Sequence, residues 1–160
     1  MEELFRSAEK LVNAARGKKT VIALAESCTG GMVSMALTSV PGSSDVFDRG
    51  FITYSYEAKI EMLGVDALTL IKKGAVSSAC VEEMVRGAIK NSRADIAISI
   101  SGIAGPGGGT EEKPVGMVYF GLLDKRNDKF EIHKHKFTGD RHAVRVLSAM
   151  KAIEILMENL

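Results

Sequence analysis

Two short apolar runs constrain this chain more than any other feature of its sequence. The first is TVIALA at residues 20–25, and the second is DIAISIS at residues 95–101. Apolar, β-rich runs of this length are typical of buried strands. A sheet built from such strands must be covered by helices on both faces, so the pattern favours an α/β fold.

Helical periodicity separates these runs, and Gly17, Pro41-Gly42 and Gly64 mark expected helix ends. The sequence predicts one domain over residues 1–160, an α/β/α sandwich of three layers with a mixed sheet. Two of its strands form an antiparallel pair joined by the polar turn DKRND. The expected strands are 20–25, 47–55, 95–101, 115–123 and 129–137, and the expected helices lie within 4–15, 32–40, 56–64, 66–73, 77–93 and 140–160.

The charge balance argues against several classes of function. The chain has 21 basic and 20 acidic residues, for a formal net charge of +1 at pH 7. Without a basic stripe, it is not expected to bind nucleic acid or an anionic membrane. The opening segment resembles neither a signal peptide nor a membrane span, and two cysteines are too few for a disulfide framework. We therefore expect a cytoplasmic protein.

Polar, glycine-bearing loops follow both buried runs, at the sheet edge where α/β proteins bind ligands. ESCTGG, residues 26–31, also opens a helix, so the amides of Thr29, Gly30 and Gly31 are placed to meet an anion. The alternative is a tight turn that needs small residues. GIAGPGGGT, residues 102–110, has the length of a binding loop or lid, although neither loop matches a nucleotide fingerprint.

A candidate nucleophile and base occur between residues 41 and 59. Ser44 offers a hydroxyl, and Lys59 can remove its proton if burial lowers the pKa of the lysine. Serine–lysine pairs are an established variant of the catalytic triad. The alternative interpretation is a capping serine and a solvated lysine. Cys28 is a rival nucleophile, because a helix N-terminus lowers the pKa of a thiol.

His133 and His135 would share one face of a strand, a spacing compatible with metal binding. No third ligand is evident, so we expect no metal site. Arg141, at the start of the last helix, can hold a phosphate or carboxylate, or pair with Asp140.

Five longer stretches of the chain are distinctive when taken together and in order. They are ALAESCTGG, PGSSDVFDRGFITYSYEAK, GAVS, SISGIAGPGGGTEEKPVGMVYFGL and GDRHAVR. In this order they closely resemble the CinA C-terminal domain family, the nicotinamide mononucleotide deamidases. Tyr56 departs from the family, which more often has Asn there. The larger members carry an additional amino-terminal domain, so the resemblance is to the stand-alone form.

The resemblance implies hydrolysis of the carboxamide of nicotinamide mononucleotide to nicotinic acid mononucleotide and ammonia, without a metal or organic cofactor. It also implies an α/β/α fold and a homodimer or larger homo-oligomer. By similarity, Ser44 is the nucleophile and Lys59 its base, while Tyr54 and Ser101 position the reacting groups. Arg141 binds or steers the charged end of the substrate.

The same resemblance assigns the glycine-bearing loops to the nucleotide. An alternative for the second loop is a dimer contact. The expected substrate-binding residues are Glu26, Ser27, Thr29, Gly30, Gly31, Gly105, Gly107 and Gly108.

Three questions stay open at the level of sequence. The nucleophile is Ser44 or lies in the Ser27-Cys28 pair. The substrate is nicotinamide mononucleotide or another pyridine nucleotide. The alternative function is that of a catalytically inactive, partner-binding module of the competence or damage-inducible type.

Overall fold

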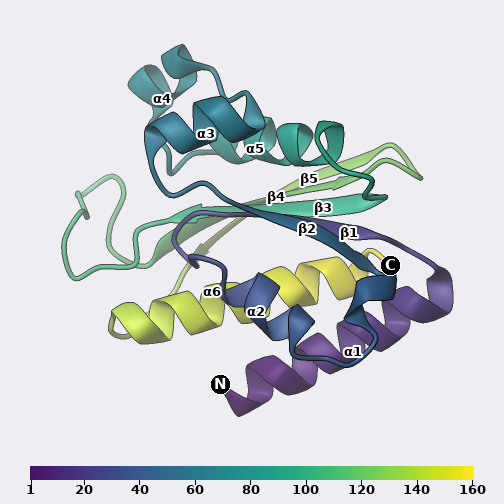
Figure 1. The fold of residues 1–160 in the computed structure, drawn as a ribbon. Coiled ribbons are helices and arrows are strands. Elements are labelled where there is room, and N and C mark those ends of the chain that lie inside the picture. The colour runs from purple at the N-terminus through teal and green to yellow at the C-terminus, as the bar shows by residue number, and fades with distance from the viewer.

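The computed structural model, which describes residues 1–160, has a mixed sheet between two layers of helices (Figure 1). Its five strands lie in the order β2-β1-β3-β4-β5. β1, β2 and β3 are parallel, whereas β4 runs antiparallel to β3, and β5 runs antiparallel to β4. The strands are β1 (Ile22–Glu26), β2 (Phe47–Ile52), β3 (Ile96–Gly102), β4 (Met117–Asp124) and β5 (Lys129–Lys136).

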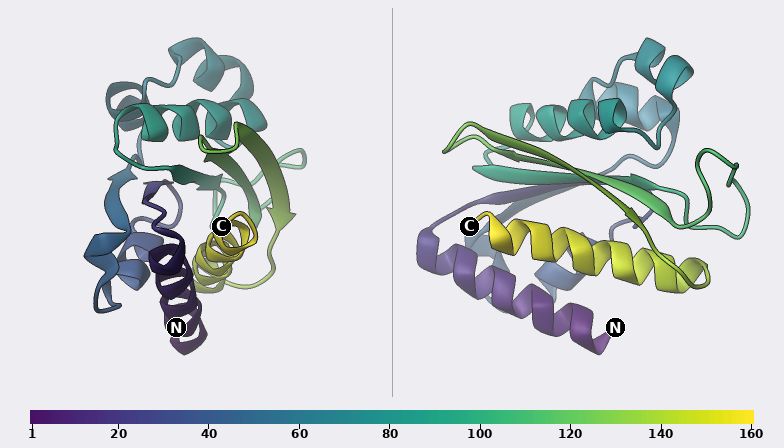
Figure 2. Two further views of the ribbon diagram at one scale, coloured as in Figure 1. Left: turned by 90° about the vertical axis from the view of Figure 1, so that its right-hand side faces the viewer. Right: turned by 180° about the vertical axis from the view of Figure 1, so that it is seen from behind.

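Helices cover both faces of this sheet (Figure 2). One face, the α6 face, carries α1 (Glu2–Lys18), α2 (Met32–Thr38) and α6 (Arg141–Glu158). The other, the α5 face, carries α3 (Tyr56–Leu63), α4 (Ala67–Lys73) and α5 (Ser78–Lys90), with α5 packed directly on β3 and β4. A short 3-10 helix, η1 (Ser43–Asp45), precedes β2. The arrangement confirms the predicted α/β/α sandwich with a mixed sheet.

The predicted helices and strands are present in the predicted order, with small differences at their ends. One such difference concerns the strand predicted over 47–55, because β2 ends at Ile52. The hydroxyl of Ser55 accepts a hydrogen bond from the amide of Ala58 at 3.0 Å and so caps α3. This cap starts the helix immediately after the strand.

Successive side chains of the buried strands pack against different helical layers. Leu24 of β1 belongs to the apolar cluster on the α6 face, whereas Ala23 and Ala25 belong to the cluster on the α5 face. Small strand residues on the α5 face let α5 approach the sheet closely. The hydroxyl of Ser99 in β3 donates to the carbonyl of Val81 in α5 at 2.6 Å.

The contact between α3 and α5 provides a test of this packing. A Cβ atom added at Gly87 of α5 would lie 2.0 Å from the carbonyl oxygen of Leu63. Replacement by Ala must therefore push α3 away from α5, although Ala is the better helix former. We expect Gly87→Ala to lower the free energy of unfolding by about 1–3 kcal/mol, measured by urea denaturation.

The matched control is Gly17→Ala in α1, where an added Cβ would meet no atom within 4 Å. That variant should be as stable as the parent, or more stable by up to about 1 kcal/mol. Equal stability of Gly87→Ala and the parent would contradict the close packing of these two helices.

Candidate active site

Four side chains form one row on the α5 face, across the carboxyl ends of the parallel strands and the adjoining start of β4. Glu26 pairs with Ile52 and with Ile100, so the next residues along, Thr53, Ser27 and Ser101, continue the same register. Backbone hydrogen bonds extend the pairing, from the amide of Thr53 to the carbonyl of Glu26 and from the amide of Ser27 to the carbonyl of Ile100. Ser101 in turn pairs with Tyr119 of β4. We call Thr53, Ser27, Ser101 and Tyr119 the polar row.

Lys59 reaches this row from the middle of α3. Its side chain is 1% exposed, and its Nζ lies 2.8 Å from Ser27 Oγ. The same nitrogen donates to the backbone carbonyls of Thr53 at 2.7 Å and Tyr54 at 3.2 Å. None of the eight ion pairs of the chain involves Lys59. Burial lowers the pKa of Lys59 below its ordinary value, because no carboxylate compensates for the lost hydration of the ammonium.

The three contacts of Lys59 fix the direction of its lone pair when the amine is neutral. A neutral amine has two N–H groups, and the carbonyls of Thr53 and Tyr54 accept both of them. The lone pair then points to the remaining neighbour, the hydroxyl of Ser27. This arrangement aligns a base with a hydroxyl proton, which is the geometry that activates a serine nucleophile.

The structure corrects the expectation that Ser44 and Lys59 face one another. Ser44 lies in η1, before the first residue of β2, and lines a hollow with Asp48 and Arg93. Lys59 follows the other end of β2. A strand of six residues spans about 20 Å, so the two side chains lie at opposite edges of the sheet. The serine that contacts Lys59 is Ser27.

The two cysteines are buried near Lys59. Burial raises the pKa of Cys28 to about 12 and the pKa of Cys80 to about 11. Both side chains are therefore thiols near neutral pH, and a thiol is a much weaker nucleophile than a thiolate. Ser27, beside the base, is the better candidate within the Ser27-Cys28 pair.

Glu26 occupies the helix end that the sequence assigned to an anion. Its side chain is completely buried, and its two carboxylate oxygens accept hydrogen bonds at 2.7–3.2 Å. The donors are the hydroxyls of Thr29 and Ser34 and the backbone amides of Gly31, Val33 and Ser34.

This cap overturns two predictions. The carboxylate of Glu26 points into the amino end of α2 and not toward the polar row, and the amides of Gly31, Val33 and Ser34 are not free for a phosphate because they donate to that carboxylate. Thr29 is buried with its hydroxyl on Glu26. The amide of Gly30 donates to the carbonyl of Ser27 at 3.0 Å, so this turn holds the nucleophile candidate in place.

Arg141 joins the second loop to the start of α3. It donates to the carbonyl of Gly105 at 2.7 Å and to the hydroxyl of Tyr54 at 2.9 Å. Tyr54 thus contributes its carbonyl to Lys59 and its exposed hydroxyl to Arg141. Gly107 and Gly108 lie farther along the same exposed loop. The structure brings Ser27, Lys59, Ser101, Tyr54 and the Arg141–Gly105 contact to one edge of the sheet.

Thr53 is a residue that sequence reasoning did not single out. Its hydroxyl is buried without a hydrogen-bond partner, although its carbonyl accepts from Lys59. Its signal in the sequence is weak, because only Phe51 and Ile52 separate it from the polar and glycine residues of β2, and its level with Ser27 and Ser101 depends on strand register.

The two candidate metal ligands, His133 and His135, make other contacts. His133 contacts Glu131 at 2.8 Å, and His135 stacks on Phe137. No three His, Cys, Asp or Glu side chains are grouped as metal ligands. None of the helices is both long and apolar enough to cross a membrane.

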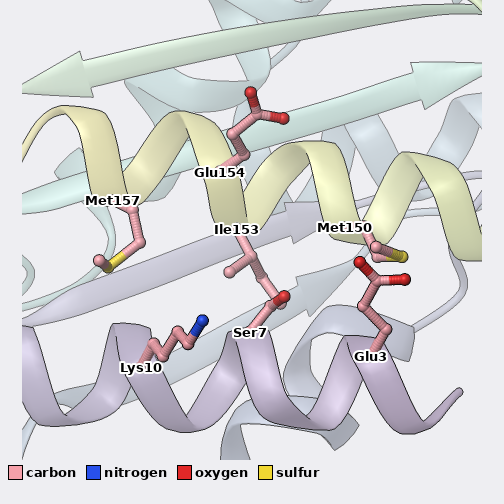
Figure 3. Close-up of a pocket in the computed structure, with 7 residues that line it drawn as sticks. All are labelled: Glu3, Ser7, Lys10, Met150, Ile153, Glu154 and Met157. Atoms are coloured by element: carbon pink, nitrogen blue, oxygen red, sulfur yellow. The ribbon is translucent and has the colours of Figure 1, made fainter.

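A groove between α1 and α6 also contains a serine and a lysine (Figure 3). Ser7 and Lys10 share this groove with Glu3, but Lys10 is exposed and makes no hydrogen bond to Ser7. The groove therefore lacks the buried base that distinguishes the polar row.

Comparisons with known proteins agree on one family. The family model described as the CinA C-terminal domain matches residues 5–160. Nicotinamide-nucleotide amidohydrolase PncC of Escherichia coli K12 is 47% identical over 156 residues, which cover 98% of this chain and 94% of that protein. A putative competence-damage inducible protein of Caldicellulosiruptor bescii is 47% identical over 152 residues, 95% of this chain. The chain spans only 36% of that longer relative.

Solved structures give the same result. The competence/damage inducible protein of Agrobacterium tumefaciens superposes with a TM-score of 0.94 at 40% identity, over 97% of this chain and 94% of that one. A CinA-superfamily protein of Klebsiella pneumoniae superposes with a TM-score of 0.92 at 37% identity, over 98% and 96% of the two chains.

The cap formed by Glu26 leads to a prediction about stability. Glu26→Gln keeps the size of the side chain but turns an NH₂ group toward donors that need an acceptor. We expect a loss of about 2–4 kcal/mol in the free energy of unfolding, measured by urea denaturation. Glu9→Gln, on the exposed side of α1, is the control and should change stability by less than about 0.5 kcal/mol. Similar losses in the two variants would contradict the role of the buried carboxylate.

Proposed function

Because this chain belongs to the CinA C-terminal domain family, we propose that it is an amidohydrolase that converts nicotinamide mononucleotide and water to nicotinic acid mononucleotide and ammonia. The observation that carries the proposal is the buried contact between Lys59 Nζ and Ser27 Oγ at 2.8 Å. The similarity to nicotinamide-nucleotide amidohydrolase supports the choice of substrate, since it extends over nearly the whole of both chains. An intact nucleophile and base also favour an enzyme over an inactive partner-binding module.

The reaction begins with transfer of the Ser27 proton to the neutral amine of Lys59. Ser27 Oγ bonds to the carboxamide carbon, and the electron pair of the C=O bond moves to the oxygen. The resulting ammonium of Lys59 then donates its proton to the departing nitrogen. The electron pair on the oxygen re-forms the C=O bond as the C–N bond breaks, and ammonia is released. The product of this half-reaction is an ester between Ser27 and the nicotinoyl group.

Hydrolysis of that ester uses the same base. Lys59 accepts a proton from water, the hydroxide adds to the ester carbon, and the C–O bond to Ser27 breaks as the proton returns to Ser27 Oγ. Carboxylic acid is released, and the initial pair is restored. While Lys59 carries the proton between these transfers, the carbonyls of Thr53 and Tyr54 accept hydrogen bonds from its ammonium.

The neighbours of the pair have supporting roles in this proposal. Ser101, next to Ser27 in the polar row, orients the carboxamide. Arg141 and Tyr54 hold Gly105 at the mouth of the site. A Cβ at Gly107 would meet no atom within 4 Å, so packing does not demand a glycine there, and close approach of the nucleotide to the backbone of Gly107 and Gly108 is the reason we propose. The cytoplasmic location and the homo-oligomer implied by the resemblance remain predictions.

Replacement of each candidate serine by alanine tests which of them is the nucleophile. Ser27→Ala should reduce release of ammonia from nicotinamide mononucleotide by at least about 1,000-fold, because no other hydroxyl contacts Lys59 Nζ. Ser44→Ala is the matched control and should retain the parental rate within about twofold, since Ser44 lies at the other edge of the sheet. Activity that survives in Ser27→Ala but not in Ser44→Ala would reverse the assignment.

The pH dependence of kcat/KM tests the base. Only the neutral amine of Lys59 accepts the proton of Ser27, so the rate should fall as pH decreases through the pKa of Lys59. Burial lowers that pKa, so the fall should begin below the pH at which an exposed lysine titrates. Lys59→Met should lose at least about 100-fold in kcat/KM, with its fold checked by circular dichroism. A parental pH profile in Lys59→Met would exclude this lysine as the base.

A further inference from the structure

The proposed substrate carries a phosphate that the polar row cannot bind by itself. The row offers hydroxyls and one lysine that must be neutral to act as a base. The amino end of α2, the helix that follows Ser27, is filled by the carboxylate of Glu26. Arg141, which the resemblance assigns to the charged end of the substrate, already donates to the carbonyl of Gly105 and the hydroxyl of Tyr54. Another positively charged part of the molecule is therefore a candidate for the phosphate.

A hollow of about 500 Å³ lies on the α5 face beside the polar row. Its walls come from the end of α4, the start of α5, the loop between β3 and β4, and β4 itself. The α4 helix and the β3–β4 loop project at the same end of the molecule (Figures 1 and 2). The lining residues are Lys72, Lys73, Val76, Ser77, Ser78, Ala79, Glu112, Lys113 and Tyr119.

Tyr119 connects this hollow to the candidate nucleophile. It is the last member of the polar row and pairs with Ser101, which in turn lies beside Ser27. Two strand spacings separate the backbone of Ser27 from that of Tyr119, which amounts to about 10 Å. A pyridine ring and a ribose separate the carboxamide from the phosphate in a mononucleotide and are suited to bridge a gap of this order.

The charge of the hollow favours an anion. It contains three lysines and one glutamate, so its lining has a formal charge of 3 − 1 = +2. None of the ion pairs of the chain involves Lys72, Lys73 or Lys113. Ammonium groups gathered without a partner repel one another, and a phosphate would relieve that repulsion. The groove between α1 and α6 is the reverse case, with Glu3 and Glu154 against Lys10 (Figure 3).

A tether holds the lysines from different segments together. Lys113, in the β3–β4 loop, donates from Nζ to the carbonyl of Lys73 at the end of α4. The contact places the ammonium of Lys113 at the carboxyl end of α4, the part of that helix that carries Lys72 and Lys73. It also gives a role to two stretches that the catalytic pair leaves unused, GAVS at 74–77 and EEK at 111–113.

We propose that this hollow binds the 5′-phosphate of the nucleotide whose carboxamide lies at Ser27. The inference rests on the proposed function and adds to it the site of the anionic group. Lys72, Lys73 and Lys113 contact the phosphate, and Tyr119 lies between it and the reacting end of the substrate.

The test compares nicotinamide mononucleotide with nicotinamide riboside, which has the same carboxamide and ribose but lacks the phosphate. The quantity measured is the ratio of the two kcat/KM values, from ammonia release. In the parent the mononucleotide should be the better substrate. Lys72→Met and Lys113→Met should each lower the ratio by about 10-fold or more, through the mononucleotide alone. Unchanged riboside hydrolysis shows that the catalytic pair is intact in each variant.

Lys72→Met is the more decisive variant, because the tether to Lys73 uses Lys113 instead. Lys10→Met, in the groove between α1 and α6, is the control and should leave the ratio unchanged. If the ratio also survives in Lys72→Met and Lys113→Met, the hollow does not bind the phosphate, while the amidohydrolase proposal stands. If the parent releases ammonia from neither compound, the proposed function and this inference both fail.

Discussion

The burial of one amine without a counter-ion is the constraint around which this molecule is organised. An ammonium at the position of Lys59 loses its hydration and gains no carboxylate in exchange, so burial lowers the pKa of this amine below that of an exposed lysine. The carbonyls of Thr53 and Tyr54 come from the turn that ends β2, and the Ser55 cap starts α3 there. The parallel pairing of β1 and β2 then puts Ser27 within reach.

Two neighbouring residues at the end of β1 face opposite helical layers, because successive side chains of a strand alternate between the two faces of the sheet. Glu26 points to the α6 face and caps α2, whereas Ser27 points to the α5 face and meets Lys59. The buried carboxylate therefore fixes the turn that follows the nucleophile. The same carboxylate prevents a substrate anion from binding at the amino end of α2. One interaction therefore both holds the turn after Ser27 in place and excludes the substrate's phosphate from this helix end.

The sequence predicted the fold well because the fold depends on local periodicity, and apolar spacing such as that of α5 is visible along the chain. It predicted the site less well because the site depends on register. Ser44 and Lys59 are close in sequence, but an extended strand separates them, whereas Ser27 is remote in sequence and adjacent in space. The sequence suggested that Glu26 belongs to a ligand-binding loop. Its carboxylate oxygens instead accept hydrogen bonds from backbone amides of α2, which come into position only when that helix has folded.

The glycine-rich loop between β3 and β4 is fixed to the rest of the molecule near both of its ends. Near its start, the carbonyl of Gly105 is bound by Arg141, and near its end Lys113 is bound to α4. The backbone of Gly108 has a positive φ of 83°, which explains a glycine there by conformation, but Gly107 has no such requirement. A segment fixed at both ends, with three consecutive glycines at 107–109 between them, suits a ligand that extends from the polar row to the lysine-lined hollow. A loop that served only as a flexible connection would need neither the Arg141–Gly105 contact nor the Lys113–Lys73 contact.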